Sequence, residues 1–257
     1  MSDSYRALCS DFYVNQKLAL KLDLPRERQT VLDLCDRVRR QFPSMTQFRR
    51  YRDELALESD PGAEQNRWMA IRNQSIRSGV VNPGSLAEAY APHKHLLEVA
   101  PYFLGISPLD VDYLELLFGF DVTTERNQDE VVFEALVAGS PLARLLDVPG
   151  ATPTDCQPLL GVVIRDAQGP QGRNIGEVEA AFEVKTRNAE RDGRRGEPTP
   201  EPISVYLTLR KYGPVGEIKD LPTVFDALAH IGEELIESRV VPNMIVPIRD
   251  AAGSSSH

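Results

Sequence analysis

Charged and apolar residues alternate along residues 177–187, the segment EVEAAFEVKTR. Because successive side chains of a β-strand point to opposite faces, this alternation predicts a strand with one apolar and one charged face. Carboxylates on such a face can hold a hard divalent cation, while basic side chains neutralise phosphate oxygens. The segment therefore provides candidate catalytic residues for a metal-dependent phosphohydrolase: Glu177, Glu179, Glu183 and Lys185.

A solvated strand face is the alternative interpretation of the same segment. Enzymes of the triphosphate-tunnel type carry a Glu-x-Glu-x-Lys pattern, but here Glu177 and Glu179 are followed by Ala181 where that pattern has Lys. One wet face of an antiparallel sheet gives the same alternation without any site. The solvated face is therefore the favoured interpretation.

A second group of candidates combines arginine with aromatic side chains in residues 46–58 and 67–76. Faces of this kind can bind single-stranded nucleic acid, because bases stack on the rings and guanidinium groups contact phosphates. Alternation places Phe48 with Arg50 and Arg52 on one strand face, and Arg49 with Tyr51 on the other, so the basic residues are split. Nucleic acid is not the expected partner. The candidate residues are Phe48, Arg50, Arg52, Trp68 and Arg72.

Metal and nucleophile motifs are absent from the sequence. The pair His93 and His95 lies in a predicted helix, where positions two apart point in nearly opposite directions. There is no Cys pair, no His-Glu-x-x-His spacing and no Gly-x-Ser-x-Gly elbow. His93 is expected to be a hydrogen-bonded core residue, and no metal or cofactor is expected. The glycine-rich segment 168–177 precedes a strand rather than a helix, so it is expected to be a hairpin loop and not a phosphate loop.

Charge is distributed unevenly along the 257 residues, whose formal net charge is −9. Residues 1–105 carry 15 Lys+Arg against 13 Asp+Glu, whereas residues 106–257 carry 14 against 25. An acidic second half repels nucleic acid and anionic membranes. The first residues lack the pattern of a secretory signal, and no apolar run is long enough to span a membrane. Three widely separated cysteines favour a reducing compartment, so a cytoplasmic protein is expected.

The predicted elements define an α+β fold with mostly antiparallel sheet and about four helices. Strands are predicted at residues 18–24, 46–58, 67–76, 112–122, 159–166, 176–187 and 203–211. Helices are predicted at 31–42, from an N-cap at Ser85, from a cap at Asn127 towards 146, and at 221–240. Each half thus reads strand, helix, strands, helix, which suggests an internal duplication. The predicted parts are residues 1–105, residues 106–247 and a flexible tail, 248–257.

The predicted function follows from these patterns and from the missing motifs. A non-enzymatic interaction or ligand-binding module is favoured, with another protein or a second copy of the chain as partner. The metal-dependent phosphohydrolase and the single-stranded nucleic-acid binder remain the alternatives. The identity of any small ligand stays open.

Overall fold

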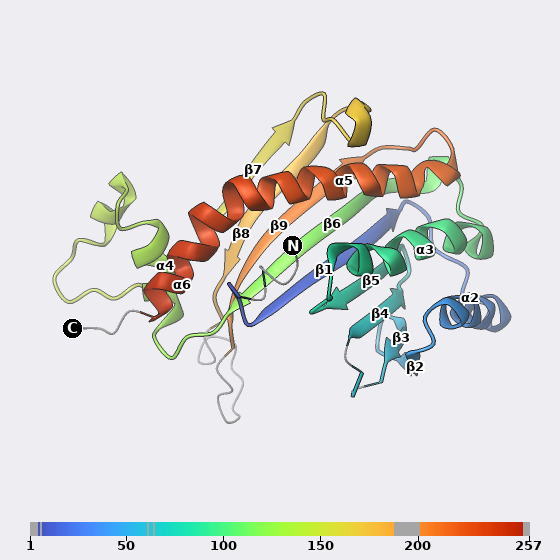
Figure 1. Cartoon of the computed structure of the whole chain (residues 1–257), viewed down its shortest axis with the longest axis horizontal. Helices are drawn as coiled ribbons and strands as arrows, with labels where there is room; N and C mark the ends of the chain where they lie inside the picture. Colours follow the sequence, from blue (N-terminus) through green and yellow to red (C-terminus); the bar gives the residue numbers. More distant parts are fainter. Residues whose placement is uncertain (1–4, 6, 61, 64, 188–200, 254–257) are drawn as a thin grey trace.

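The protein, described here by a computed structural model, forms one nine-stranded antiparallel sheet with helices on one face (Figure 1). Residues 5, 7–60, 62–63, 65–187 and 201–253 are described. The α+β prediction is confirmed. The strand order across the sheet is β2-β3-β4-β5-β1-β6-β9-β8-β7, so β2 and β7 are its two edges.

Each half of the chain contributes a block of adjacent strands to this sheet. The first block consists of β1 (Asp11–Leu20), β2 (Met45–Arg50), β3 (Leu55–Ser59), β4 (Asn66–Ile71) and β5 (Ser75–Val81). The second consists of β6 (Val111–Val122), β7 (Leu159–Ile164), β8 (Val178–Lys185) and β9 (Ile203–Tyr212). The blocks meet where β1 pairs with β6, so both halves share one sheet. The common order of elements does not confirm an internal duplication.

The helices α2 (Arg28–Gln41), α3 (Leu86–Leu104) and α5 (Leu221–Leu235) lie on the same face of the sheet (Figure 1). The core forms between them and one side of the strands. Along β1, the side chains of Phe12, Val14 and Leu18 are buried on this helix-covered face. The other face, called the open face below, carries no described helix and is rich in tyrosine and charge.

The strand β1 lies further upstream than the alternating leucines predicted. It begins at Asp11 and ends at Leu20, whereas residues 18–24 were expected to form it. Leu22 is 67% exposed, because the chain has already left the sheet there. Apolar residues at positions 12, 14 and 18 continue the alternation toward the N-terminus. All three pair with β6, and Val14 and Leu18 also pair with β5.

Two predicted strands are each a hairpin in the structure. Residues 46–58 contain β2 and β3, joined by a turn in which the Tyr51 N–H donates to the Glu54 carbonyl at 2.9 Å. Residues 67–76 lie within β4 and β5, where Arg72 N–H donates to the Ser75 carbonyl at 2.9 Å. These turns lack the Pro-Gly signal that marked the loop between them, so alternation alone did not reveal the reversals.

The capping predictions are confirmed at two helix starts. The Ser85 hydroxyl accepts the Glu88 N–H at the start of α3, and the Asn127 side chain accepts the N–H groups of Asp129 and Glu130 at the start of α4 (Gln128–Leu136). The helix α4 ends ten residues before the predicted end near 146, and a separate short turn, η2 (Pro141–Leu146), follows.

The C-terminal helix continues beyond the predicted residue 240. A π-helical stretch, η5 (Ile236–Ile245), follows α5 and accommodates Pro242, and α6 (Val246–Gly253) follows it. The prediction of a flexible tail from 248 is therefore wrong up to Gly253, since Ile248 and Ala251 are buried and α6 packs against α4. Residues 254–257 lie outside the described part. Within that part, no helix has the length and apolar character needed to cross a membrane.

Candidate functional site

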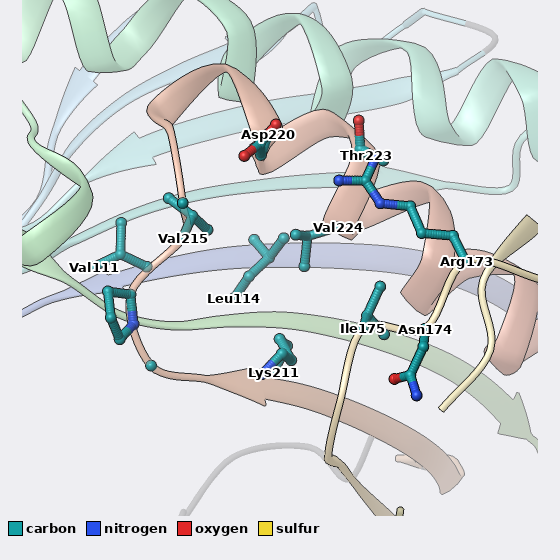
Figure 2. Close-up of a pocket in the computed structure, with 13 residues that line it drawn as sticks. Val111, Leu114, Arg173, Asn174, Ile175, Lys211, Val215, Asp220, Thr223 and Val224 are labelled. Carbon is teal, nitrogen blue, oxygen red and sulfur yellow. The ribbon is translucent and has the colours of Figure 1, made fainter. Parts of the chain in front are cut away.

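A cavity of about 250 Å³ opens at one end of the sheet, beside the start of α5 (Figure 2). Three segments far apart in the sequence form it: the start of β6, the loop between β7 and β8, and the stretch from the end of β9 into α5. This loop is the glycine-rich hairpin loop that the sequence predicted.

The floor of the cavity is apolar. Val111 and Leu114 of β6 are buried there, and Ile175 and Val224 face them from the loop and from α5 (Figure 2). Val215, in the connection from β9 to α5, adds a further apolar side chain. A ligand placed here would bury hydrocarbon surface, which contributes roughly 25 cal/mol per Å².

Two cations and one carboxylate stand at the rim. Arg173 reaches from the loop toward Thr223 on α5, while Lys211 lies on the opposite side of the cavity (Figure 2). The Lys211 Nζ donates to the Tyr212 carbonyl at 3.1 Å. Asp220 is engaged locally, because its Oδ2 accepts the Glu217 N–H at 3.0 Å. Arg173 has no ion pair within the described residues, so its guanidinium can bind a ligand without breaking a salt bridge there.

Backbone contacts hold the arginine-bearing loop in place. The Gly169 N–H donates to the Arg173 carbonyl at 2.7 Å, and the Ile175 N–H donates to the Ala167 carbonyl at 2.9 Å. A Cβ on Gly169 would lie only 2.7 Å from the Ala227 Cβ of α5, so only glycine permits this close approach. The loop therefore packs directly on α5, and this fixes the position of Arg173 relative to the helix.

The charged strand predicted at 177–187 is β8, with its charges on the open face. Val178, Ala180 and Val184 are buried under the helices, as alternation predicted. Two of the candidate catalytic residues pair with each other, Lys185 Nζ lying 3.2 Å from Glu183 Oε1. A third, Glu177, is exposed and faces Arg165 at 3.9 Å.

The remaining candidate, Glu179, belongs to a row of charges that runs across the sheet. Strand register places Glu179 opposite Arg210, and Arg210 opposite Glu115, whose Oε2 accepts the Arg210 Nε–H at 2.5 Å. Burial and the hydrogen bond with Glu179 raise the pKa of Tyr212. Glu179 and Arg210 also line a hollow of about 230 Å³ over β7, β8 and β9.

The charges in this row neutralise one another, and the row lacks the composition of a metal site. Glu179, Arg210, Glu115 and Lys17 alternate in sign along it. Among the described residues, no group of three or more His, Cys, Asp or Glu side chains could hold a metal ion. Glu179 thus has the basic neighbour that the phosphohydrolase hypothesis requires, Arg210. The described residues contain no cluster of carboxylates that could hold the metal ion.

The candidate nucleic-acid residues divide between the two faces of the sheet. Phe48 and Arg50 share one face, as alternation predicted, and this face is the helix-covered one. They line a groove of about 360 Å³ together with Arg26 and Arg28. Arg52 follows the end of β2 and does not line this groove.

The other two nucleic-acid candidates lie on the open face. The ring of Trp68 lies across Gly79, where a Cβ would come within 2.3 Å of it, and Arg77 stacks over that ring. Arg72 pairs with Glu54 at 2.7 Å. These contacts are internal to the sheet, so the five candidates do not form one binding surface.

His93 is a core residue, as the sequence predicted. It is fully buried in α3, and its Nδ1 lies 2.7 Å from the Ser78 hydroxyl of β5. Burial lowers the pKa of His93 to about 3, so the imidazole is neutral in the folded protein. This residue has a structural role beneath α3 and does not contribute to the cavity.

Comparisons with known proteins do not identify the chain. No family model matches it, and no curated protein matches it. Among solved structures, a match covers 95% of this chain and 99% of the other, the di-domain ARO/CYC BexL from the BE-7585A biosynthetic pathway, at 9% identity and a TM-score of 0.24. A similarity at this TM-score supports no conclusion about the site.

No local pattern in the sequence indicates the cavity. Its residues come from positions 111–114, 173–175 and 211–224, and each segment is ordinary by itself. The glycine-rich segment is the one local feature near the cavity, and the strand that follows it in sequence argues against a phosphate loop. The helix beside it is instead α5, which begins more than forty residues later in the chain.

Proposed function

We propose that the protein is a ligand-binding module that holds a small organic anion in the cavity at the start of α5. The observation that carries the proposal is the combination of an apolar floor with two cationic side chains, Arg173 and Lys211, at its rim. Small-molecule sites in proteins are mostly apolar and use a few polar groups to fix the orientation of the ligand.

The chemistry of the rim favours a carboxylate with an apolar body. An arginine fork binds a carboxylate through two parallel hydrogen bonds, and a lysine adds a point charge. With Asp220 at the same rim, the balance of the three charges is +1, which suits a monoanion better than a dianion. A volume of about 250 Å³ limits the ligand to a small one.

The test is a binding titration of the full chain with benzoate, hexanoate and inorganic phosphate, followed by calorimetry and thermal unfolding. Benzoate or hexanoate is expected to raise the unfolding temperature, since a ligand at 100 times its Kd adds about 2.7 kcal/mol of native-state stability. Phosphate, which lacks an apolar body, is expected to bind at least tenfold more weakly.

Matched variants locate the binding. Arg173→Gln should weaken carboxylate binding about tenfold, because it removes the unpaired guanidinium. Arg165→Gln removes an exposed arginine of the same hairpin outside the cavity, and it should leave affinity unchanged. Val224→Phe should block binding by filling the cavity without any change of charge. Equal affinity in all four proteins, or no binding of either acid, would overturn the proposal.

Single-stranded nucleic acid is a second candidate ligand, at the β2 edge of the sheet. The groove beside β2 gathers Arg26, Arg28 and Arg50 around the exposed ring of Phe48. Guanidinium groups beside a stacking ring are the combination that single-strand binders use. This candidate is weaker because Arg52, Trp68 and Arg72 do not line the groove, and its test is given in the Discussion.

A further inference from the structure

The edge strand β7 exposes an uncharged, apolar backbone. Its six residues, LLGVVI, contain no charge and no proline. Leu159, Leu160, Val162 and Val163 are 62%, 66%, 49% and 54% exposed, respectively. Natural proteins usually protect such an edge with lysine, proline, a bulge or a covering element, because it is a template for another strand.

The hydrogen-bonding pattern shows which residues of β7 face outward. The Val184 N–H donates to the Pro158 carbonyl at 3.0 Å, in register with the β7–β8 pairing. In an antiparallel ladder, hydrogen-bonded and non-hydrogen-bonded pairs alternate. Positions 160, 162 and 164 therefore bond to β8. Leu159, Gly161 and Val163 direct their N–H and C=O groups away from the sheet.

The sequence of β7 is nearly symmetric about Gly161. Two large apolar residues precede the glycine and two follow it. A two-fold axis through Gly161, perpendicular to the sheet, would pair the outward groups of one copy with those of another. Leu159 of each copy would then lie opposite Val163 of the other, and Leu160 opposite Val162, so each side chain would meet an apolar partner on its own face.

We propose that the protein forms a symmetric dimer through antiparallel pairing of β7 with β7 of a second copy. The occupant is a second copy because the strand is complementary to itself, and two-fold pairing is the commonest closed arrangement of homo-oligomers. The nine strands of each copy would continue into one sheet of eighteen. This inference does not depend on the anion-binding proposal.

The acidic character of the second half does not oppose this pairing. The nearest acidic side chains on the open face, Glu179 and Glu183, lie on β8 and not on β7. In the paired sheet, Glu179 of one copy and Glu183 of the other would be three strand spacings, about 14 Å, apart. That separation exceeds the Debye length of about 8 Å at physiological ionic strength, so the repulsion is screened.

A cysteine at the two-fold axis tests the register directly. Nothing lies within 4 Å of a Cβ built on Gly161, so Gly161→Cys is expected to fold. The two copies of residue 161 would form a hydrogen-bonded pair, whose Cα atoms lie about 5.5 Å apart, within the range for a disulfide. Mild oxidation of the full chain should give a covalent dimer, and peptide mapping should find position 161 linked to position 161. Leu159→Cys, whose two copies would lie far apart, should not cross-link to itself.

Sedimentation measures the association without a cross-link. The wild-type chain should shift from monomer to dimer over an about hundredfold range of concentration. Val163→Lys should weaken the dimer at least tenfold, since it places a charge opposite Leu159 of the other copy. Leu22→Lys, which changes an equally exposed leucine far from β7, should leave it intact. A wild-type chain that stays monomeric throughout, or a cross-link as efficient at position 159 as at 161, would overturn the proposal.

Discussion

The two edge strands of the sheet, β2 and β7, differ in whether they are protected against pairing with a strand of another molecule. The β2 edge carries Arg49 and Arg50, and its pairing with β3 is interrupted by a register shift between Met45 and Gln47. Charges and bulges of this kind prevent a strand from another molecule from pairing. The β7 edge has neither device, since its register with β8 is continuous and its six residues are uncharged.

This difference between the two edges is what the proposed dimer would explain. The arginines of β2 show that an edge strand of this sheet can carry charged residues. The unprotected edge strand is also the one whose sequence is symmetric. This symmetry favours pairing with a second copy of the chain over nonspecific aggregation. Under the dimer proposal, β7 is the edge that pairs with a second copy, whereas the arginines of β2 keep that edge from pairing with another strand.

The largest effect is expected from proline on the inward side of β7. Val162→Pro removes an N–H that bonds to β8, and it should lower the free energy of unfolding by about 3 kcal/mol. Val163→Pro removes an N–H that points outward, so it should cost the monomer less than about 1 kcal/mol while abolishing the dimer. Urea unfolding and sedimentation of both variants measure the two effects separately.

The comparison fails if the two prolines behave alike. If both substitutions lower the free energy of unfolding equally, the N–H groups of the outward residues of β7 are already hydrogen-bonded within the protein. In that case, the assignment of inward and outward positions from the Val184 to Pro158 hydrogen bond would be wrong.

Much of the fold follows from the sequence, because alternation and capping are local. The buried residues of β8 and the caps at Ser85 and Asn127 were identified correctly for this reason. The turns at 51–54 and 72–75 were missed because neither contains the glycine or proline that usually marks a reversal. The helix beyond 240 was missed because its burial depends on α4, which is distant in the sequence.

The candidate sites were harder to predict, because both depend on tertiary neighbours. Arg173 lines the cavity because its loop packs on α5 at Gly169, and this contact joins parts of the chain that are far apart in sequence. The segment 159–166 was recognised as a strand, but its position at the edge follows from strand order, which a pattern of six apolar residues does not encode. The charged face of β8, by contrast, was visible in sequence and proves to be largely paired with neighbouring charges.

A pH-dependent loss of stability should originate at His93, where α3 packs on the central strands β5 and β1. His93 is neutral when folded, with its pKa lowered to about 3, whereas an unfolded histidine has a pKa near 6.5. Below pH 6.5 the unfolded chain binds a proton that the folded chain does not, so stability falls as the pH falls. Between pH 6.5 and pH 5 the loss from this residue should be about 2 kcal/mol.

Urea unfolding across this pH range, with His93→Gln as the comparison, isolates the contribution. The variant should be less stable than wild type at pH 7.5, because it disturbs the contact with Ser78, but it should show a flatter dependence on pH. A variant that keeps the full slope would place the titrating group elsewhere. The dissociation constant of the proposed dimer should change little with pH, since β7 carries no titratable side chain.

The smallest effect is expected at the groove beside β2. Arg50→Gln should lower the affinity for a single-stranded oligonucleotide about threefold to tenfold and reduce the salt slope by about 1, because one phosphate contact is lost. Arg165→Gln, which removes an arginine just beyond β7, is the control and should have no effect. Filter binding at several salt concentrations measures both. If the two variants lose affinity equally, the binding is diffuse electrostatic attraction. The arginines of β2 would then serve to protect the edge and not to recognise a ligand.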